Sequence, residues 1–209
     1  MPAAHTEDQL QETSAPVFLT GFEPFLGHAV NPSGELVRAL MADPPRGVQV
    51  VGKVLPVDFR AADEALRVAL EGVWALKPVA LLSLGVQRRP YYRLERLARA
   101  RLDSKKTDAA GILARDLEPR GRGVRQTCLD LERLVAVLTA AGAGDARISS
   151  DAGGFLCEFV YYGLLGAAEA RGLPAVFLHL PPVDVVAVED QIPVLRALVA
   201  ELARGAAGE

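Results

Sequence analysis

Short apolar runs rich in β-branched residues alternate along the chain with longer stretches in which apolar residues recur every three or four positions. The short runs predict buried strands, and the longer stretches predict amphipathic helices. Five strands are expected, at residues 17–20, 48–55, 79–84, 146–149 and 175–180. Strands that alternate with helices in this way are typical of an α/β fold with a mostly parallel sheet.

Five helices are predicted from apolar residues that share one helical face. In the first helix this face is formed by Val37, Leu40 and Met41. Asn31-Pro32 marks its start, because asparagine is a good cap and proline is tolerated in the first turn. The other helices are expected around residues 66–73 and 131–138, after residue 154, and around residues 195–202.

The length and composition of the chain fit one domain. It has 209 residues, of which 50% are hydrophobic and 23% are charged, so there is enough apolar material for one core. We therefore predict a single-domain, three-layer α/β/α sandwich over residues 15–209, with a twisted, mostly parallel sheet flanked by helices. Residues 1–14 are polar and mixed, and we expect them to form a flexible N-terminal tail.

Charge and cysteine content narrow the class of protein further. The 23 basic and 26 acidic residues give a net charge of −3, which does not favour nucleic acid or an anionic membrane as a partner. No stretch approaches the roughly 18 consecutive apolar residues of a membrane span, and the N-terminus does not resemble a signal peptide. Two cysteines are too few for a disulfide framework. These features predict a cytoplasmic protein.

Candidate chemistry lies in the segments that follow the strands, because open α/β sheets bind ligands beyond the carboxyl ends of their strands. The first strand is followed by GFEPFLG (21–27), the third by GVQRRPYYRLER (85–96) and the fourth by SDAGGFLCE (150–158). The last strand ends with His179. We expect a cysteine, a histidine, a glutamate and two phenylalanines to meet at one edge of the sheet.

Cys157 is the candidate nucleophile. It follows a glycine-rich turn at the expected start of a helix, where backbone N–H groups lower a thiol pKa and can stabilise an oxyanion. His179 would be its base, and Glu95 would orient the imidazole. The structural alternatives are a buried cysteine, a core histidine and a solvated glutamate. Cys128 has no comparable setting and is expected to be a small apolar residue before a helix.

Neither a metal nor a nucleotide cofactor is expected. The sequence contains no CxxC, HxxxH or HExxH spacing that would indicate a metal site. The glycines of GFEPFLG match neither GxGxxG nor GxxxxGK[ST], so they do not indicate a phosphate loop.

The chain also carries a series of motifs in a recognisable order. VFLTGFEPFLGHAVNPS (17–33) resembles the opening signature of the pyroglutamyl peptidase I family of cysteine peptidases, also called pyrrolidone-carboxylate peptidases. KVLPVDF (53–59) is similar to the second segment of that family. RPYYRLERLA (89–98), SSDAGGFLCEFVYY (149–162) and VFLHLPP (176–182) resemble its glutamate, cysteine and histidine motifs. The resemblance covers nearly the whole predicted domain.

The resemblance implies an exopeptidase that removes an N-terminal pyroglutamyl residue from peptides and needs no metal or cofactor. It implies that Cys157 is the nucleophile, His179 the general base and acid, and Glu95 the orienting carboxylate. It also implies a cytoplasmic homo-oligomer, often a tetramer. The further residues that we expect at the substrate or the oxyanion are Phe22, Phe25, Arg89, Gly153, Gly154 and Phe155.

Four departures from the family pattern concern the surroundings of the site. Leu26 stands where glycine is usual, and Glu158 and Phe159 follow the nucleophile where asparagine and an often polar residue are usual. The segment 85–89, which contains Gln87, is one residue shorter, and the loop reads TDAAG at 107–111 in place of DNxG. Two other functions therefore stay open: a different cysteine-dependent hydrolase of small amides, and a catalytically silent protein that binds pyroglutamate.

Overall fold

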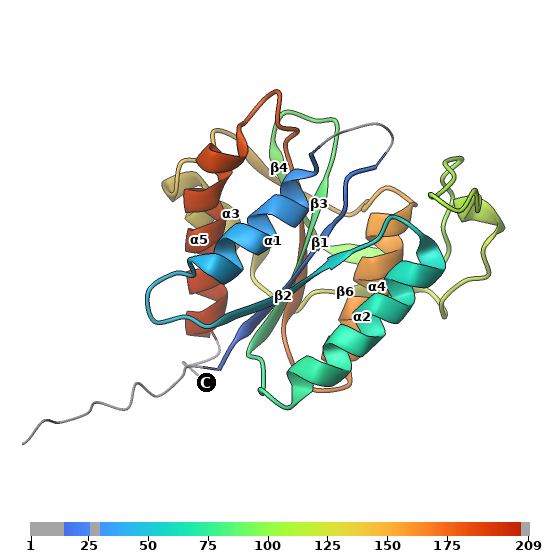
Figure 1. The fold of residues 1–209 in the computed structure, drawn as a ribbon, viewed down its shortest axis with the longest axis horizontal. Coiled ribbons are helices and arrows are strands. Elements are labelled where there is room, and N and C mark those ends of the chain that lie inside the picture. The colour runs from blue at the N-terminus through green and yellow to red at the C-terminus, as the bar shows by residue number, and fades with distance from the viewer. Residues whose placement is uncertain (1–14, 26–29, 206–209) are drawn as a thin grey trace, which may run out of the picture.

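A six-stranded sheet with helices on both faces forms the single domain of this protein (Figure 1). The computed structural model describes residues 15–25 and 30–205. The predicted tail, residues 1–14, lies outside the described residues. In spatial order the strands are β2 (Val50–Leu55), β1 (Val17–Phe22), β3 (Ala80–Val86), β8 (Ala175–Leu180), β4 (Tyr92–Glu95) and β7 (Ala146–Ser149).

Four of these strands run in one direction and two run in the other. β1 pairs in parallel with β2 and β3, and β3 pairs in parallel with β8. β4 is antiparallel to β8, and β7 is parallel to β4. The sheet is therefore mostly parallel, as predicted, but the expectation that the strand at 146–149 ends at the same edge as the others is wrong. Its partner, β4, reverses the direction at that side of the sheet.

All five predicted strands are present, and three short strands were not predicted. One of them is β4, which lies in the segment 85–96 that was noted only as following the third strand. The other two, β5 (Leu97–Arg99) and β6 (Val124–Gln126), form a separate antiparallel pair. Because β4 has only 4 residues and β5 and β6 have 3 each, they are too short to show a clear alternation of apolar and polar positions.

The five predicted helices are confirmed and make the two outer layers. One face of the sheet is covered by α1 (Pro32–Ala42), α3 (Leu131–Ala140) and α5 (Val188–Gly205), and the other face by α2 (Phe59–Trp74) and α4 (Leu156–Glu169) (Figure 1). Asn31 caps α1 through a hydrogen bond from the Ser33 amide, as predicted. Met41 is exposed, although the helical pattern placed it with the buried Val37 and Leu40. No helix within the described ranges is long and apolar enough to span a membrane.

Alternation along the strands decides which helices the functional side chains meet. In β8, Val176 and Leu178 belong to the core under α1, α3 and α5, whereas Ala175 and Phe177 belong to the core under α2 and α4. Because successive side chains of a strand point to opposite faces, His179 points toward α2 and α4. The sheet therefore presents its histidine to the helix that begins with Leu156 and Cys157.

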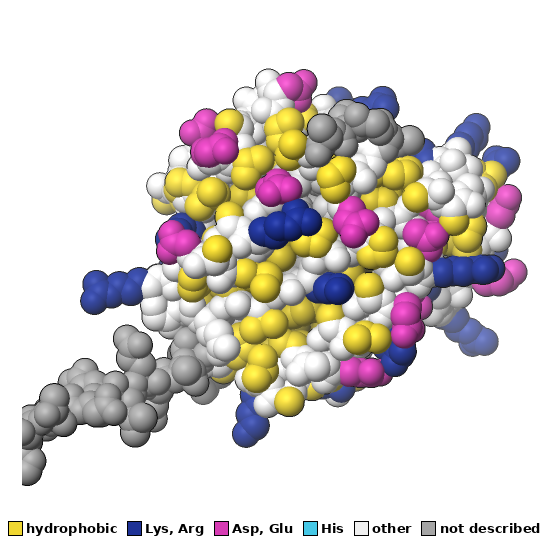
Figure 2. Space-filling view, viewed as in Figure 1, with side chains coloured by type: hydrophobic (Ala, Val, Ile, Leu, Met, Phe, Trp, Pro, Cys, Tyr) yellow, Lys and Arg dark blue, Asp and Glu magenta, His cyan; other side chains and the backbone are white. Residues whose placement is uncertain are grey.

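The surface seen in Figure 2 carries charges of both signs. Lys and Arg side chains are interspersed with Asp and Glu side chains on this face, among scattered apolar groups. Several arginines are held by neighbouring carboxylates, such as Arg67, which contacts both Glu64 and Glu71 on the exposed side of α2. Pairs of this kind neutralise part of the surface charge.

Candidate active site

His179 lies near the end of β8, between residues of two neighbouring strands. Its register partners are Gly85 on β3 and Arg93 on β4. The side chain is buried, and its Nδ1 atom lies 2.7 Å from Oε1 of Glu95. Because a carboxylate can only accept a hydrogen bond, Nδ1 carries the hydrogen, and the other ring nitrogen, Nε2, is an acceptor.

Glu95 is the last residue of β4 and is fully buried. Its Oε1 atom accepts hydrogen bonds from His179 and from Nε of Arg93, at 2.7 and 2.6 Å. The second oxygen, Oε2, is buried and has no partner among the described residues. The Tyr161 hydroxyl, on α4, donates to the main-chain carbonyl of Glu95 at 2.9 Å and so fixes the strand beneath the carboxylate. Burial of this kind excludes the solvated position that was the structural alternative for Glu95.

Cys157 lies in the first turn of α4, with its Sγ atom directly over Gly85. A β-carbon at Gly85 would come within 2.9 Å of this sulfur and within 2.7 Å of Cζ of Phe177. The absence of a side chain at Gly85 therefore creates the space that the thiol occupies. Since Gly85 pairs with His179, and paired strands lie about 4.8 Å apart, the sheet brings the thiol and the imidazole to neighbouring positions.

The thiol of Cys157 has a raised pKa, of about 12. Burial is the largest cause, and the negative charge of Glu95 acts in the same direction, while Lys106 and Arg93 oppose the shift. The expectation of a lowered thiol pKa is therefore wrong, because the desolvation of the thiolate outweighs the effect of the backbone at the helix N-terminus. At neutral pH the thiol is protonated, so a reaction at sulfur needs a base that takes the proton.

Two backbone N–H groups of the turn before Cys157 donate to carboxylates. The amide of Gly153 donates to Oδ1 of Asp151 at 3.1 Å, and the amide of Gly154 donates to Oε2 of Glu158 at 2.6 Å. Both glycines have a positive φ, of 94° and 63°, which side-chain-bearing residues rarely adopt. The side chain of Phe155, the N-cap residue, does not cap the helix. The amides of Gly153 and Gly154, two residues expected at the substrate or the oxyanion, thus donate to carboxylates.

Glu158 is a buried carboxylate with partners on all sides. Oε1 accepts from the amide and Nε of Arg99 at 2.9 and 2.8 Å, and Oε2 accepts from Nη2 of Arg99 at 2.8 Å and from the Gly154 amide. The hydrogen bonds to Glu158 raise the pKa of Arg99. This residue, noted in the sequence only as a departure, ties the turn of the nucleophile to β5.

Aromatic side chains pack around Phe155, in the turn before Cys157. The rings of Phe25 and Phe155 stack with centroids 6.5 Å apart, and Phe59 meets both Phe155 and Phe159 edge-on at 5.3 Å. Phe25 and Phe155 are half-buried, whereas Phe22 is buried in the core of the same sheet face. Of the two predicted pocket phenylalanines, Phe25 is the one that reaches the turn of the nucleophile. Leu26 and His28 lie outside the described residues.

The long loop after β5 is docked on the site. Asp108 is buried and accepts hydrogen bonds from the amides of Phe59, Ala110 and Ile112 at 2.9, 3.0 and 2.8 Å. The Ser104 amide donates to the carbonyl of Gly154 at 3.1 Å. Lys106 places its Nζ atom 5.9 Å from the centre of the Phe155 ring. The altered TDAAG segment therefore retains an aspartate that fastens the loop to the start of α2.

Arg93 is the arginine that the structure places at the histidine. Arg89, which was expected near the oxyanion, is exposed in the segment between β3 and β4. Arg93 lies two residues before Glu95 on the same face of β4, and its Nη2 atom is 3.5 Å from Nδ1 of His179. Sequence reasoning missed Arg93, although the alternation in YRLE would have placed it beside Glu95 had the strand been recognised.

Gln87 follows β3 at the same end of the sheet. Its Nε2 atom donates to the carbonyl of Tyr91 at 2.6 Å, and its amide donates to the carbonyl of Leu180 at 3.1 Å. Its Oε1 atom is buried and without a partner among the described residues. The hydrogen bonds of Gln87 thus stabilise the shortened segment between β3 and β4.

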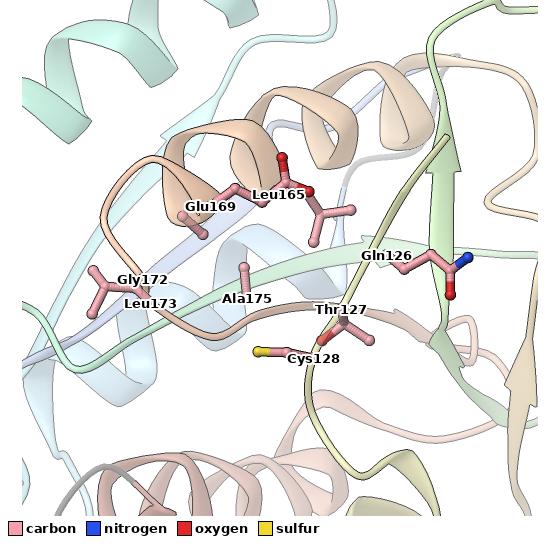
Figure 3. A pocket seen from close by; sticks show the side chains of 9 residues that line it. Gln126, Thr127, Cys128, Leu165, Glu169, Gly172, Leu173 and Ala175 are labelled. Carbon is pink, nitrogen blue, oxygen red and sulfur yellow. The ribbon is translucent and has the colours of Figure 1, made fainter. Parts of the chain in front are cut away.

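A cavity of about 250 Å³ lies at the far end of α4 (Figure 3). Its walls include Leu165 near the end of the helix, Ala175 at the start of β8, and the exposed Cys128. The thiol of Cys128 is therefore remote from His179, at the opposite end of β8. The described part of the chain contains no group of three or more His, Cys, Asp or Glu side chains arranged to hold a metal ion.

A thiol, an imidazole and a buried carboxylate at one end of an open α/β sheet are the arrangement typical of thiol-dependent hydrolases. Comparison with known proteins makes the assignment specific. The sequence model of the pyroglutamyl peptidase family matches residues 15–203. The chain therefore belongs to the pyroglutamyl peptidase family, whose members are peptide hydrolases.

Similar sequences and structures agree with this assignment. A pyrrolidone-carboxylate peptidase of Chromobacterium violaceum is 38% identical over 169 residues, which are 79% of this chain and 77% of that protein. One of Gloeobacter violaceus is 36% identical over 169 residues, 79% of this chain and 80% of its own. A mutant pyrrolidone carboxyl peptidase of Pyrococcus furiosus has a TM-score of 0.81 at 27% identity, over 91% of this chain and 98% of that chain.

Proposed function

We propose that this protein hydrolyses the peptide bond that follows an N-terminal pyroglutamyl (5-oxoprolyl) residue, through a thioester formed on Cys157. The observation that carries the chemistry is the buried contact of 2.7 Å between Nδ1 of His179 and Oε1 of Glu95, one strand away from the glycine over which the thiol lies. Membership of the pyroglutamyl peptidase family supports the substrate class.

Acylation begins from the neutral thiol, because burial keeps Cys157 protonated. Nε2 of His179 takes the thiol proton as Sγ attacks the carbonyl carbon of the pyroglutamyl group. The imidazolium then returns this proton to the departing amine nitrogen, the C–N bond breaks, and a thioester remains on Cys157. Glu95 accepts the hydrogen of Nδ1 throughout and stabilises the transient imidazolium.

Deacylation repeats the proton transfers with water. His179 takes a proton from a water molecule whose oxygen attacks the thioester carbon, the C–S bond breaks, and the sulfur recovers its proton from the imidazolium. The products are free pyroglutamate and a peptide shortened by one residue.

The oxyanion of each tetrahedral intermediate needs N–H donors at the start of α4. Phe155 does not cap the helix with its side chain, and N–H groups of the first helical turn have no partner within the helix itself. We assign the donors to the backbone from Phe155 to Cys157, while Gly153 and Gly154 shape the turn. A donor of this kind contributes about 3 kcal/mol to catalysis in comparable sites.

The pyroglutamyl ring would lie against Phe25 and Phe155. Both rings are half-buried beside the nucleophile, and a small uncharged ring suits an apolar slot with few polar contacts. Phe22, in β1, belongs to the apolar core behind this slot. Phe25→Ala should therefore raise KM for a pyroglutamyl substrate.

The resemblance to the family also supports three broader proposals: a cytoplasmic location, a homo-oligomeric state and catalysis without metal or cofactor. Light scattering of the purified protein tests the oligomeric state. Full activity after dialysis against EDTA is the result expected of an enzyme that uses no metal.

Hydrolysis of matched aminocoumarin amides tests the substrate class. Pyroglutamyl-aminocoumarin should be cleaved with a kcat/KM at least about 10³-fold above that of the prolyl analogue, which brings a charged amine into an apolar slot and lacks the lactam oxygen. Faster turnover of the glutaminyl analogue would instead indicate another small-amide hydrolase. Tight binding of pyroglutamate without turnover of any amide would indicate a silent member of the family.

A further inference from the structure

Arg93 touches two of the three residues assigned to the reaction. Its Nε atom donates to Oε1 of Glu95 at 2.6 Å, and its Nη2 atom lies 3.5 Å from Nδ1 of His179. The strand register explains this position, because Arg93 pairs directly with His179 and precedes Glu95 by two residues on the same face of β4. The arginine side chain is mostly buried, with 21% of its surface exposed.

The charge of Glu95 needs a cation nearby. Its carboxylate is fully buried, and one of its two oxygens has no partner among the described residues. An ion in the protein interior loses its hydration, so opposite charges and hydrogen-bond donors must stabilise it there. A neutral His179 provides only one hydrogen bond, whereas Arg93 adds a permanent positive charge to the same oxygen.

Arg93 also acts on the electrostatics of the thiol. The charged groups that face Cys157 are Glu95 and Arg93 from β4 and Lys106 from the docked loop. Glu95 raises the pKa of Cys157, and Lys106 and Arg93 lower it. His179, from β8, is the titratable group beside them, and Glu158 on α4 itself is neutralised by Arg99. Arg93 is therefore the counter-ion, on the same strand, of the carboxylate that disfavours the thiolate.

We propose that Arg93 is a positioning residue of this active site: it holds Oε1 of Glu95 toward His179, and it offsets the negative charge of Glu95 at the thiol. The role of Arg93 in peptide hydrolysis rests on the proposed function, whereas its effect on the thiol does not. Arg88, which has no assigned role, is exposed in the segment between β3 and β4, so it provides a matched control.

Three variants separate charge from shape. Arg93→Met removes the charge and keeps much of the length, Arg93→Lys keeps the charge, and Arg88→Met removes a charge from the neighbouring segment. Each is made in a Cys128→Ser background, because Cys128 is exposed and would otherwise react with thiol reagents. Circular dichroism and thermal melts establish that each variant is folded.

The first measurement is hydrolysis of pyroglutamyl-aminocoumarin. Arg93→Met should lower kcat by about 10²-fold and change KM by less than about threefold, because the residue acts on the reacting groups and not on the ring slot. Arg93→Lys should recover at least about tenfold of this loss, and Arg88→Met should stay within about twofold of the parent. Should Arg93→Met fail to fold, Arg93→Gln takes its place in the comparison with Arg93→Lys.

The second measurement is the rate at which iodoacetamide alkylates Cys157 at pH 9, followed by mass spectrometry, which does not depend on the substrate. Loss of the cation should slow alkylation about tenfold in Arg93→Met, while Arg88→Met reacts as the parent does. If Arg93→Met is alkylated more slowly than the parent but the parent cleaves no pyroglutamyl amide, the proposed function is overturned and the role of Arg93 is retained. Equal alkylation and kcat in Arg93→Met and Arg88→Met, or no recovery in Arg93→Lys, would overturn that role.

Discussion

The sulfur of Cys157 lies where a side chain at Gly85 would stand, since a β-carbon built on Gly85 comes within 2.9 Å of it. Gly85 is also the register partner of His179, and the ring of Phe177 closes the same space from β8. One glycine on β3 thus sets the distance between the helix that carries the thiol and the strand that carries the imidazole.

Gly85→Ala should impair both activity and stability. The added methyl group meets Sγ of Cys157 and the ring of Phe177, so α4 or Phe177 must move, at a cost of about 1–3 kcal/mol in the free energy of unfolding. We expect kcat to fall by at least about tenfold, because displacement of the nucleophile by a fraction of an ångström is enough to misalign it. Urea denaturation and steady-state kinetics measure the two effects.

The control for this substitution is Gly72→Ala in α2. A β-carbon at Gly72 has nothing within 4 Å, and alanine favours a helix by about 0.5–1 kcal/mol over glycine. This variant should be as active as the parent and equally or more stable. An active, fully stable Gly85→Ala protein would show that Cys157 does not depend on the space above β3.

Glu95→Gln should lower kcat by about 10² to 10⁴ while the fold is retained. The amide keeps the shape of the side chain but no longer stabilises an imidazolium, and it leaves Arg93 without its counter-ion. Steady-state kinetics with pyroglutamyl-aminocoumarin and a circular dichroism spectrum are sufficient measurements. An unchanged kcat would reduce the catalytic group to Cys157 and His179.

Glu158→Gln should destabilise the turn of the nucleophile. The variant loses the charge that holds Arg99 and replaces one acceptor by an NH₂ group, which faces N–H donors of Arg99 or Gly154. Loss of hydrogen bonds to a buried charge costs about 2 kcal/mol in the free energy of unfolding, and kcat should fall with it. The control is Glu169→Gln, on the same helix as Glu158. Glu169 forms an exposed ion pair with Arg125 of β6, and its substitution should change stability by less than about 0.5 kcal/mol. Equal effects of the two substitutions would contradict a special role for Glu158.

The raised pKa of Cys157 predicts how stability depends on pH in alkaline solution. The folded protein keeps the thiol protonated up to a pKa of about 12, whereas in the unfolded chain a cysteine ionises near about 8.5. The folded state therefore binds more protons than the unfolded state between these values, and the contribution of Cys157 to stability falls as pH rises through this window.

The measurement compares the parent with Cys157→Ser, both in the Cys128→Ser background, by urea denaturation at pH 8 and at pH 10. The free energy of unfolding of the parent should decrease more than that of the serine variant, by up to about 1.4 kcal/mol per pH unit above the pKa of the unfolded chain. Parallel decreases would mean that the thiol is not held in its neutral form.

The sequence was sufficient to predict the layers of the fold, because the helical and strand patterns of most elements are long and regular. It was insufficient for the direction of β7, since that direction depends on pairing with β4, and β4 is a strand of 4 residues flanked by turns. The same omission left Arg93 unnoticed, because its position beside Glu95 and His179 depends on β4.

The electrostatics of the site could not be predicted from local sequence. The glycine-rich turn before Cys157 indicates a helix N-terminus, which favours an anion, but it does not show that the thiol is buried beside Glu95. In the same way, the sequence does not reveal that the Gly154 amide is occupied by Glu158, because the two meet only when the turn has formed. Burial and partner choice are properties of the packed structure.

Activity of two cysteine variants tests the central claim, that Cys157 is the nucleophile, most directly. Cys157→Ser and Cys128→Ser are assayed side by side for hydrolysis of pyroglutamyl-aminocoumarin. We predict that Cys157→Ser abolishes turnover. Cys128→Ser should keep the activity of the parent, because the thiol of Cys128 lies at the far end of α4. Retention of more than a few per cent of the activity in Cys157→Ser would contradict the account.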